Sequence, residues 1–258
     1  MSELLKFLWI ALKDPLVLKS YRHIYLLSHM RANTSVLGHV LGSHPEIEGY
    51  YELHIGYYSW KSKLRQKLKY FSDHRRKGTA RYLFDKVLHN EHDFNMEVVN
   101  SEKDIVIISL REPHSTIKSI MKLYHTIDPN HEFNSIQGAT KYYIERLKHL
   151  EQFAVANKGM YYYFNADDLT AKPDETLKTL TGWLGLSSEL SKTYQKFKKT
   201  GKQGAGDSSE NMEKGEIVVK PTEESKRTEM KDSVYELYEA TESTLCEFSI
   251  NRISFSNV

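Results

Sequence analysis

The sequence predicts a single α/β domain with a central, mainly parallel sheet flanked by helices. Short apolar runs rich in strand-forming residues alternate with longer segments whose apolar residues recur at helical spacing. The 258 residues, of which 40% are hydrophobic and 27% charged, are enough for one sizeable core. No repeat, linker or change in composition divides the chain. We therefore expect one domain over 1–258, with a core over about 21–220.

Three segments are the predicted strands: residues 23–28, 105–110 and 160–164. Each is short and apolar, and turn-forming or polar residues border it. A continuous apolar run, in place of strict alternation, is typical of strands that are buried on both faces of a parallel sheet. The sheet is therefore expected to carry helices on both sides.

Helices are predicted between and after these strands. The first follows the helix-starting residues 33–35, and the others lie at 57–71, near 117–124, and at 142–153, 173–184 and 222–248. In the second helix, the spacing predicts an inward face made of Trp60, Leu64, Leu68 and Phe71. Residues 198–216 are rich in glycine and serine and predict a long loop. The stretch 4–12 predicts an amphipathic helix packed on the domain, with weak membrane-surface contact as the alternative.

Charge and composition exclude several classes of protein. Lys and Arg total 36 against 34 for Asp and Glu, so the net charge of +2 argues against a nucleic-acid partner. A single cysteine, Cys246, excludes a disulfide scaffold. No apolar run reaches the roughly 18 residues of a transmembrane helix. His89, His92 and Asp93 lie close together, but no further ligand at metal-site spacing accompanies them, so no metal is expected.

The turn between the first strand and its helix is the first candidate site. It consists of Arg31, Ala32, Asn33, Thr34 and Ser35. Backbone N–H groups at such a turn, together with two hydroxyls, can hold a phosphate or a similar oxyanion, and an arginine adds a forked cationic donor. If the turn needs a positive φ at residue 33, Asn is the best choice after glycine. The turn lacks the Gly-Lys-Ser/Thr ending of nucleotide-triphosphate loops, which disfavours ATP or GTP hydrolysis.

The second candidate site follows the strand at 105–110. Arg111 ends the strand, Pro113 forces a turn, and Ser119 comes eight residues after the arginine. At the carboxyl edge of a parallel sheet, this arrangement places Arg111 and Ser119 beside a ligand crevice.

Together the two segments resemble the sulfotransferases that use 3′-phosphoadenosine 5′-phosphosulfate (PAPS). Residues 31–35 are similar to that family's P-loop-like Arg-Ser-Gly-Thr-Thr loop for the 5′-phosphosulfate, with Ala32 and Asn33 as departures. Arg111, Pro113 and Ser119 are similar to its 3′-phosphate motif. The likeness covers about 23–216, and its layout is closest to the carbohydrate and tyrosyl-protein branches. Further matching segments are His44-Pro45 with Glu52, Phe84-Asp85-Lys86, residues 163–186, and the glycine-rich loop Lys202–Asp207.

The resemblance implies transfer of a sulfuryl group from PAPS to an acceptor hydroxyl, with 3′,5′-ADP as the second product and no metal. It implies that Glu52 is the general base, with His54 as a rival, and that Arg31 and Lys86 neutralise charge in the transition state. The residues expected to bind PAPS are Arg31, Ala32, Asn33, Thr34, Ser35, Arg111, Ser119, Lys202 and Gly204. The chain carries no signal anchor of the kind found in Golgi members, so a cytoplasmic location is expected.

The basic stretch 61–77 follows Glu52, and its usual meaning is a solvated helix face. The alternative hypothesis is an acceptor groove in which Lys63, Lys67 and Arg75, with His54, contact a carbohydrate or glycolipid. Two other functions stay open: a P-loop kinase, and a nucleotide-binding or membrane-surface interaction protein without catalytic activity.

Overall fold

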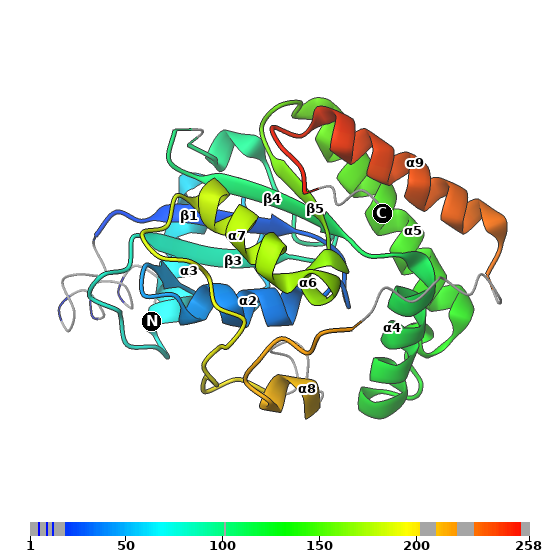
Figure 1. The fold of residues 1–258 in the computed structure, drawn as a ribbon, viewed down its shortest axis with the longest axis horizontal. Helices are drawn as coiled ribbons and strands as arrows, with labels where there is room; N and C mark the ends of the chain where they lie inside the picture. The colour runs from blue at the N-terminus through cyan, green and yellow to red at the C-terminus, as the bar shows by residue number, and fades with distance from the viewer. Residues whose placement is uncertain are drawn as a thin grey trace.

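The computed structural model describes residues 19–100, 102–201, 210–220 and 230–253, with three positions near the N-terminus, Leu5, Trp9 and Leu12. Within these residues, five parallel strands form one sheet in the order β2-β3-β1-β4-β5 (Figure 1). The parallel sheet confirms the predicted fold class. The strands are β1 (Arg22–Leu27), β2 (Ile47–Glu48), β3 (Tyr82–Val87), β4 (Ile105–Leu110) and β5 (Tyr162–Asn165).

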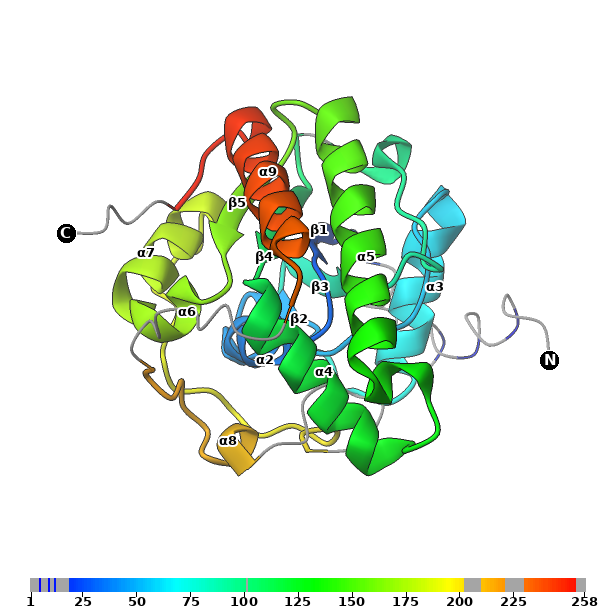
Figure 2. The ribbon, with the colours of Figure 1, turned by 90° about the vertical axis from the view of Figure 1, so that its right-hand side faces the viewer.

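Helices cover both faces of the sheet, as the apolar strands predicted (Figures 1 and 2). Successive side chains of β1 join different cores: Tyr25 and Leu27 pack toward α5 and α9, whereas Ile24 and Leu26 pack toward α2 and α7. The helices are α2 (Thr34–Ser43), α3 (Trp60–Phe71), α4 (Pro113–Ile127), α5 (Ile136–Ala156), α6 (Asp168–Ala171), α7 (Pro173–Leu184), α8 (Glu210–Glu213) and α9 (Asp232–Phe248), and two 3-10 turns lie at Met96–Val98 and Glu132–Asn134.

The predicted helices are present wherever the structure describes them. α7 has the predicted bounds, and the short helix α8 interrupts the predicted loop at 198–216. The first part of the predicted C-terminal helix, residues 222–229, and most of the predicted N-terminal helix lie outside the described residues. No helix in the described ranges is long and apolar enough to cross a membrane.

Two strands were not predicted. β2 is only two residues long, and β3 carries Asp85 and Lys86, which interrupt its apolar run even though all six of its side chains are buried. Lys86 therefore lies in a central strand with 2% of its surface exposed. Lys86 is thus not a solvated lysine on a helix.

The predicted inward face of α3 is wrong at three of its four positions. Phe71 is buried as predicted, but Trp60 is 70% exposed, Leu64 and Leu68 are only partly buried, and the other buried side chains of the helix are Ser62, Gln66 and Tyr70. A shift of two residues rotates the buried face by about half a turn. Polar partners explain the orientation, because the Ser62 hydroxyl accepts the Tyr58 N–H at 3.3 Å and Tyr70 reaches the buried Glu48 at 3.5 Å.

The sheet order places a topological switch point beside β1. From β1 the chain builds outward on one side through β2 and β3, and then crosses to the other side for β4 and β5. Loops leaving the carboxyl ends of β1 and β4 therefore diverge and leave a crevice between them. In open α/β sheets this is where ligands bind.

Helix α2 packs so closely on the segment before α3 that position 38 tolerates only glycine. A Cβ at Gly38 would overlap the carbonyl oxygen of Tyr50, whereas a Cβ at Gly182, on the exposed face of α7, would meet nothing within 4 Å. We predict that Gly38→Ala lowers the free energy of unfolding by about 1–3 kcal/mol, as overpacking does. Gly182→Ala, the control, should raise it by about 0.5 kcal/mol through helix propensity. Urea unfolding measures both, and equal effects would contradict the close packing.

Candidate functional site: an anion-binding crevice with a buried carboxylate

The turns after β1 and β4 are joined at the switch point. The Arg111 N–H donates to His29 Nε2 at 3.0 Å, and the Ser28 hydroxyl donates to the Ser109 carbonyl at 2.7 Å. Burial lowers the pKa of His29 to about 4, so its ring is neutral at physiological pH. Because Nε2 accepts, the ring proton is on Nδ1, which donates to the Met30 carbonyl at 2.8 Å. His29 thus holds the two turns at a fixed separation.

Helix α5 supports these turns from one face of the sheet. The Tyr142 hydroxyl accepts the Met30 N–H and donates to the Leu88 carbonyl, each at 2.8 Å. The Tyr143 hydroxyl donates to the Arg111 carbonyl at 2.6 Å. The Arg146 guanidinium donates to the carbonyls that end β1 and β3, Ser28 at 2.8 Å and Val87 at 2.7 Å. The pattern at 142–153 predicted the helix but not this bracing of three strand ends.

The loop at 31–35 has the backbone of an anion-binding turn. Asn33 has a φ of +54°, as the sequence predicted for a turn in which asparagine stands for glycine, and Arg31 has an unpredicted φ of +65°. The Asn33 amide donates to the Ala166 carbonyl at 2.8 Å, which ties the loop to the end of β5. α2 begins at Thr34, and the N–H groups of its first turn have no partners within the helix. They are the donors that an anion needs.

Lys86 brings a cation to a loop that contains no lysine. It projects from β3, the strand beside β1, and its Nζ lies 3.5 Å from Thr34 Oγ1 and 3.3 Å from Ser35 Oγ. Its burial removes competing water and strengthens its interaction with any anion held by the loop.

The two predicted arginines meet across the crevice. Arg31 Nε donates to Ser119 Oγ at 2.8 Å, and Arg111 Nη1 donates to the Arg31 carbonyl at 3.3 Å. The structure thus brings together six residues that the sequence nominated from three separate segments: Arg31, Thr34, Ser35, Lys86, Arg111 and Ser119. Asp167 belongs to the matching segment 163–186, and its carboxylate lies 2.8 Å from Arg111 Nε and orients that guanidinium.

Glu52 is a buried carboxylate near this group of cations. It is 7% exposed, its Oε1 has no hydrogen-bond partner among the described residues, and His54 Nδ1 lies 3.7 Å from that oxygen. An ionised oxygen without a donor is a costly arrangement in a protein interior, and such a group is available to accept a proton.

Asp85 connects Glu52 to Lys86. Its carboxylate accepts the Leu53 N–H at 3.0 Å, the Lys86 N–H at 2.8 Å and the Tyr57 hydroxyl at 2.6 Å. The first donor, Leu53, directly follows Glu52 in the chain, and the second is the backbone of Lys86 itself. Burial raises the pKa of Asp85 to about 7 in spite of the three donors. The sequence matched Asp85 to a motif but gave no signal for this connecting role.

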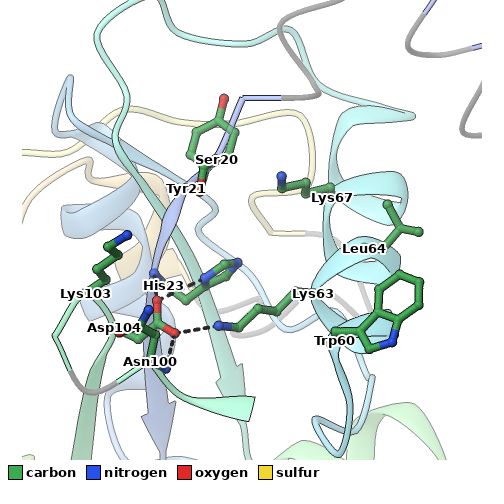
Figure 3. Close-up of a pocket in the computed structure, with 10 residues that line it drawn as sticks. All are labelled: Ser20, Tyr21, His23, Trp60, Lys63, Leu64, Lys67, Asn100, Lys103 and Asp104. Carbon is green, nitrogen blue, oxygen red and sulfur yellow. Dashed lines mark hydrogen bonds and ion pairs between the residues drawn. The ribbon is translucent and has the colours of Figure 1, made fainter.

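Lys63 and Lys67 are not brought to the crevice. Lys63 Nζ lies 2.6 Å from Asp104, and Lys67 donates to the Lys19 carbonyl at 2.9 Å. Asp104 and Lys19 come before the strands β4 and β1, whereas Arg111 and Arg31 come after these strands. Because a six-residue strand spans about 20 Å, the two lysines lie at the opposite edge of the sheet from the crevice. Both lysines point into a pocket at the amino edge of the sheet (Figure 3). Arg75 is exposed in the loop after α3.

The remaining nominated residues lie at the end of α2 away from the crevice or outside the described residues. His44 ends α2, and its Nε2 lies 2.8 Å from the Ser188 hydroxyl, so His44-Pro45 forms a structural turn. Lys202 and Gly204 lie outside the described residues. The segment leading to them is tied to α2, because His39 Nε2 lies 2.9 Å from the Thr200 hydroxyl.

Comparison with known proteins identifies the fold. No family model matches the chain, and a search of curated proteins found no match. Among solved structures, the sulfotransferase domain from the curacin biosynthetic pathway superposes with a TM-score of 0.61 at 15% identity, over 86% of this chain and 97% of that one. The sulfotransferase domain from the Synechococcus PCC 7002 olefin synthase has a TM-score of 0.56 at 14% identity, over 86% and 96%. The chain therefore has a sulfotransferase-type fold, which confirms the expectation from the sequence motifs.

The buried Asp85 makes stability depend on pH. Its pKa is about 7 in the folded protein and near the ordinary 3.8 when unfolded, so stabilisation by the protonated form is complete below about pH 4 and is lost as pH rises toward 7. We predict that Asp85→Asn, which keeps an acceptor for the two N–H groups, removes this dependence. The wild type should lose about 3 kcal/mol relative to the variant between pH 4 and pH 8.

Denaturant unfolding across this pH range measures the difference. The control is Asp174→Asn, because Asp174 is 72% exposed. Parallel pH profiles for the wild type and Asp85→Asn would contradict the raised pKa.

Proposed function

We propose that the protein is a PAPS-dependent sulfotransferase that transfers a sulfuryl group to a hydroxyl of a carbohydrate or glycolipid. One observation carries the proposal. Arg31, Lys86, Arg111 and Ser119 meet the N-terminus of α2 at the switch point of a sulfotransferase-type fold. Three cations and a helix N-terminus around one crevice suit a ligand with more than one anionic group.

The two ends of the donor would occupy different parts of the crevice. The 5′-phosphosulfate fits the loop at 31–35, where the helix N–H groups, the Thr34 and Ser35 hydroxyls and Lys86 lie together. The 3′-phosphate fits Arg111 and Ser119, since Asp167 holds the Arg111 guanidinium in place. PAPS carries a 3′-phosphate that ATP lacks, and these two residues would distinguish the two nucleotides by binding it.

The chemistry assigns one role to each group. Glu52 takes the proton of the acceptor hydroxyl, the acceptor oxygen attacks sulfur, and the bond from sulfur to the bridging phosphate oxygen breaks. The products are a sulfate ester and 3′,5′-ADP. Lys86 and Arg31 stabilise the charge that develops on the sulfuryl and leaving oxygens. The unpartnered Oε1 supports Glu52 over the exposed His54 as the base.

A hollow of about 340 Å³, lined in part by His89 and Tyr124, suits the acceptor. The charge of Glu52 acts on both side chains, so the carboxylate lies within electrostatic range of the wall of the hollow. Aromatic rings and carboxylates share its wall: Tyr124, Phe133 and Tyr142 with Glu91, Glu132 and Glu145. Rings pack against the apolar faces of sugars, and carboxylates accept hydrogen bonds from sugar hydroxyls, so a neutral saccharide fits this hollow better than an anionic one.

Donor recognition is tested by thermal unfolding with 3′,5′-ADP, AMP and ATP·Mg. At about 100 times its Kd, 3′,5′-ADP should stabilise the protein by about 2.7 kcal/mol and raise the Tm by roughly 5–10 °C, with little effect of AMP. Ser119→Ala should weaken 3′,5′-ADP binding about tenfold, because a hydrogen bond to a charged group is lost. Lys178→Ala, which removes an exposed charge on α7, is the control. Stabilisation by ATP·Mg alone would indicate a kinase.

Catalysis is tested with labelled PAPS and a panel of sugar, lipid and peptide hydroxyls. Glu52→Gln should lower kcat by about 10²–10⁴-fold, the usual contribution of a general base, while 3′,5′-ADP affinity stays the same. His54→Gln should have the smaller effect. The reverse order would make His54 the base. Retention of 3′,5′-ADP binding without turnover on any acceptor would point to a non-catalytic binding protein.

A further inference from the structure

Three side chains of metal-ligand type converge beside the crevice. Glu52, His54 and His92 each offer one ligand atom, and these atoms lie within 4.8 Å of one another. The sequence grouped His92 with His89 and Asp93, and it gave no sign that Glu52 and His54 would come from an earlier segment. Two imidazoles and one carboxylate are a ligand set that zinc enzymes use, with the fourth position open.

The backbone holds the two segments in place. Asp85 fixes both sides of His54, since it accepts the Leu53 N–H at 3.0 Å and the Tyr57 hydroxyl at 2.6 Å. Tyr57 then joins the segment that carries His92: its N–H donates to the Asp93 carbonyl and its carbonyl accepts the Asn95 N–H, both at 2.7 Å. The ligands therefore need only side-chain adjustment to close on an ion, with no folding of a loop.

Two features of this cluster are unfavourable unless something binds there. Glu52 Oε1 is buried without a hydrogen-bond donor in the described structure, which is unfavourable for a carboxylate oxygen. His54 has a φ of +51°, a left-handed conformation that is unfavourable for a residue with a Cβ. This conformation accompanies a separation of 3.7 Å between His54 Nδ1 and Glu52 Oε1. Ligand atoms of a tetrahedral Zn²⁺ lie about 3.3–3.5 Å apart.

We propose that Glu52, His54 and His92 bind a divalent transition-metal ion, with Zn²⁺ as the best match. Mg²⁺ and Ca²⁺ are disfavoured because they prefer oxygen ligands and more of them. A second part of the inference rests on the proposed function. An ion bound to the Glu52 carboxylate occupies the group that would take the acceptor proton, so Zn²⁺ inhibits sulfuryl transfer instead of assisting it.

Zn²⁺ titration of the metal-stripped full chain by calorimetry tests the site without any activity measurement. The wild type should bind one Zn²⁺ saturably. His54→Ala and His92→Ala should each weaken Zn²⁺ binding by about 100-fold. Loss of a residue that only orients a metal ligand already lowers metal affinity by about 10–100-fold, and these two residues are themselves ligands. His89→Ala is the matched control, because its ring lies 6.4 Å from both the His54 and the His92 rings and it supplies no ligand atom to the cluster. Its affinity should stay within about threefold of the wild type.

Two further readouts keep the result independent of folding. Thermal unfolding in chelator should give His92→Ala a Tm close to that of the wild type, and His92→Gln offers a second variant of similar bulk. Added Zn²⁺ should raise the Tm of the wild type and of His89→Ala but not that of His54→Ala or His92→Ala. Absence of saturable Zn²⁺ binding, or equal affinity in all four proteins, would overturn the site.

The inhibitory part is decided separately. Zn²⁺ should inhibit sulfuryl transfer by the wild type, a chelator should restore it, and His92→Ala should need at least tenfold more Zn²⁺ for the same inhibition. Zn²⁺ binding with unchanged transfer would reject the overlap with the base. If no acceptor is sulfated, the proposed function fails, whereas the Zn²⁺ titration still decides the metal site.

Discussion

The buried guanidinium of Arg146 is the interaction on which the candidate site depends most. It is 1% exposed, and it donates to Ser28, to Val87 and to the Asn90 side chain, so one cation holds the ends of β1 and β3 together. Burial lowers its pKa to about 10, which leaves it charged at neutral pH. Its removal would take the guanidinium donor away from both strand-end carbonyls, and the Val87 carbonyl would keep the Ser28 N–H at 3.2 Å. The loop at 31–35 and Lys86 both start from the strand ends that Arg146 joins.

A second buried charge organises the other half of the site. Asp85 accepts the Leu53 N–H, the Tyr57 hydroxyl and the Lys86 N–H, so the carboxylate proposed as base and the cation proposed to face it share one support. Arg146 and Glu52 also interact, because the Glu52 charge raises the pKa of Arg146 against the larger effect of burial. The crevice is therefore a network of buried ionisable groups, in which moving one group displaces several.

Local patterns in the sequence were enough for much of this architecture. β1, β4 and α7 were found because apolar runs and turn residues mark their bounds, and Arg31, Lys86, Arg111 and Ser119 were found because motif order follows the strand ends. β3 was missed because Asp85 and Lys86 break its apolar pattern. The buried face of α3, the pairing of Asp167 with Arg111, and the approach of His92 to Glu52 depend on contacts between distant segments, and no local pattern carries that information.

The Asn33 contact has a consequence for how the protein can be produced. Asn33-Thr34-Ser35 has the form of an acceptor sequence for N-linked glycans, and the glycan would be attached to the same amide nitrogen that donates to the Ala166 carbonyl. Attachment during translocation would replace this contact with a bulky group at the start of α2. Expression through a eukaryotic secretory pathway would thus yield a modified chain with an obstructed crevice, whereas a bacterial cytoplasmic host avoids this modification.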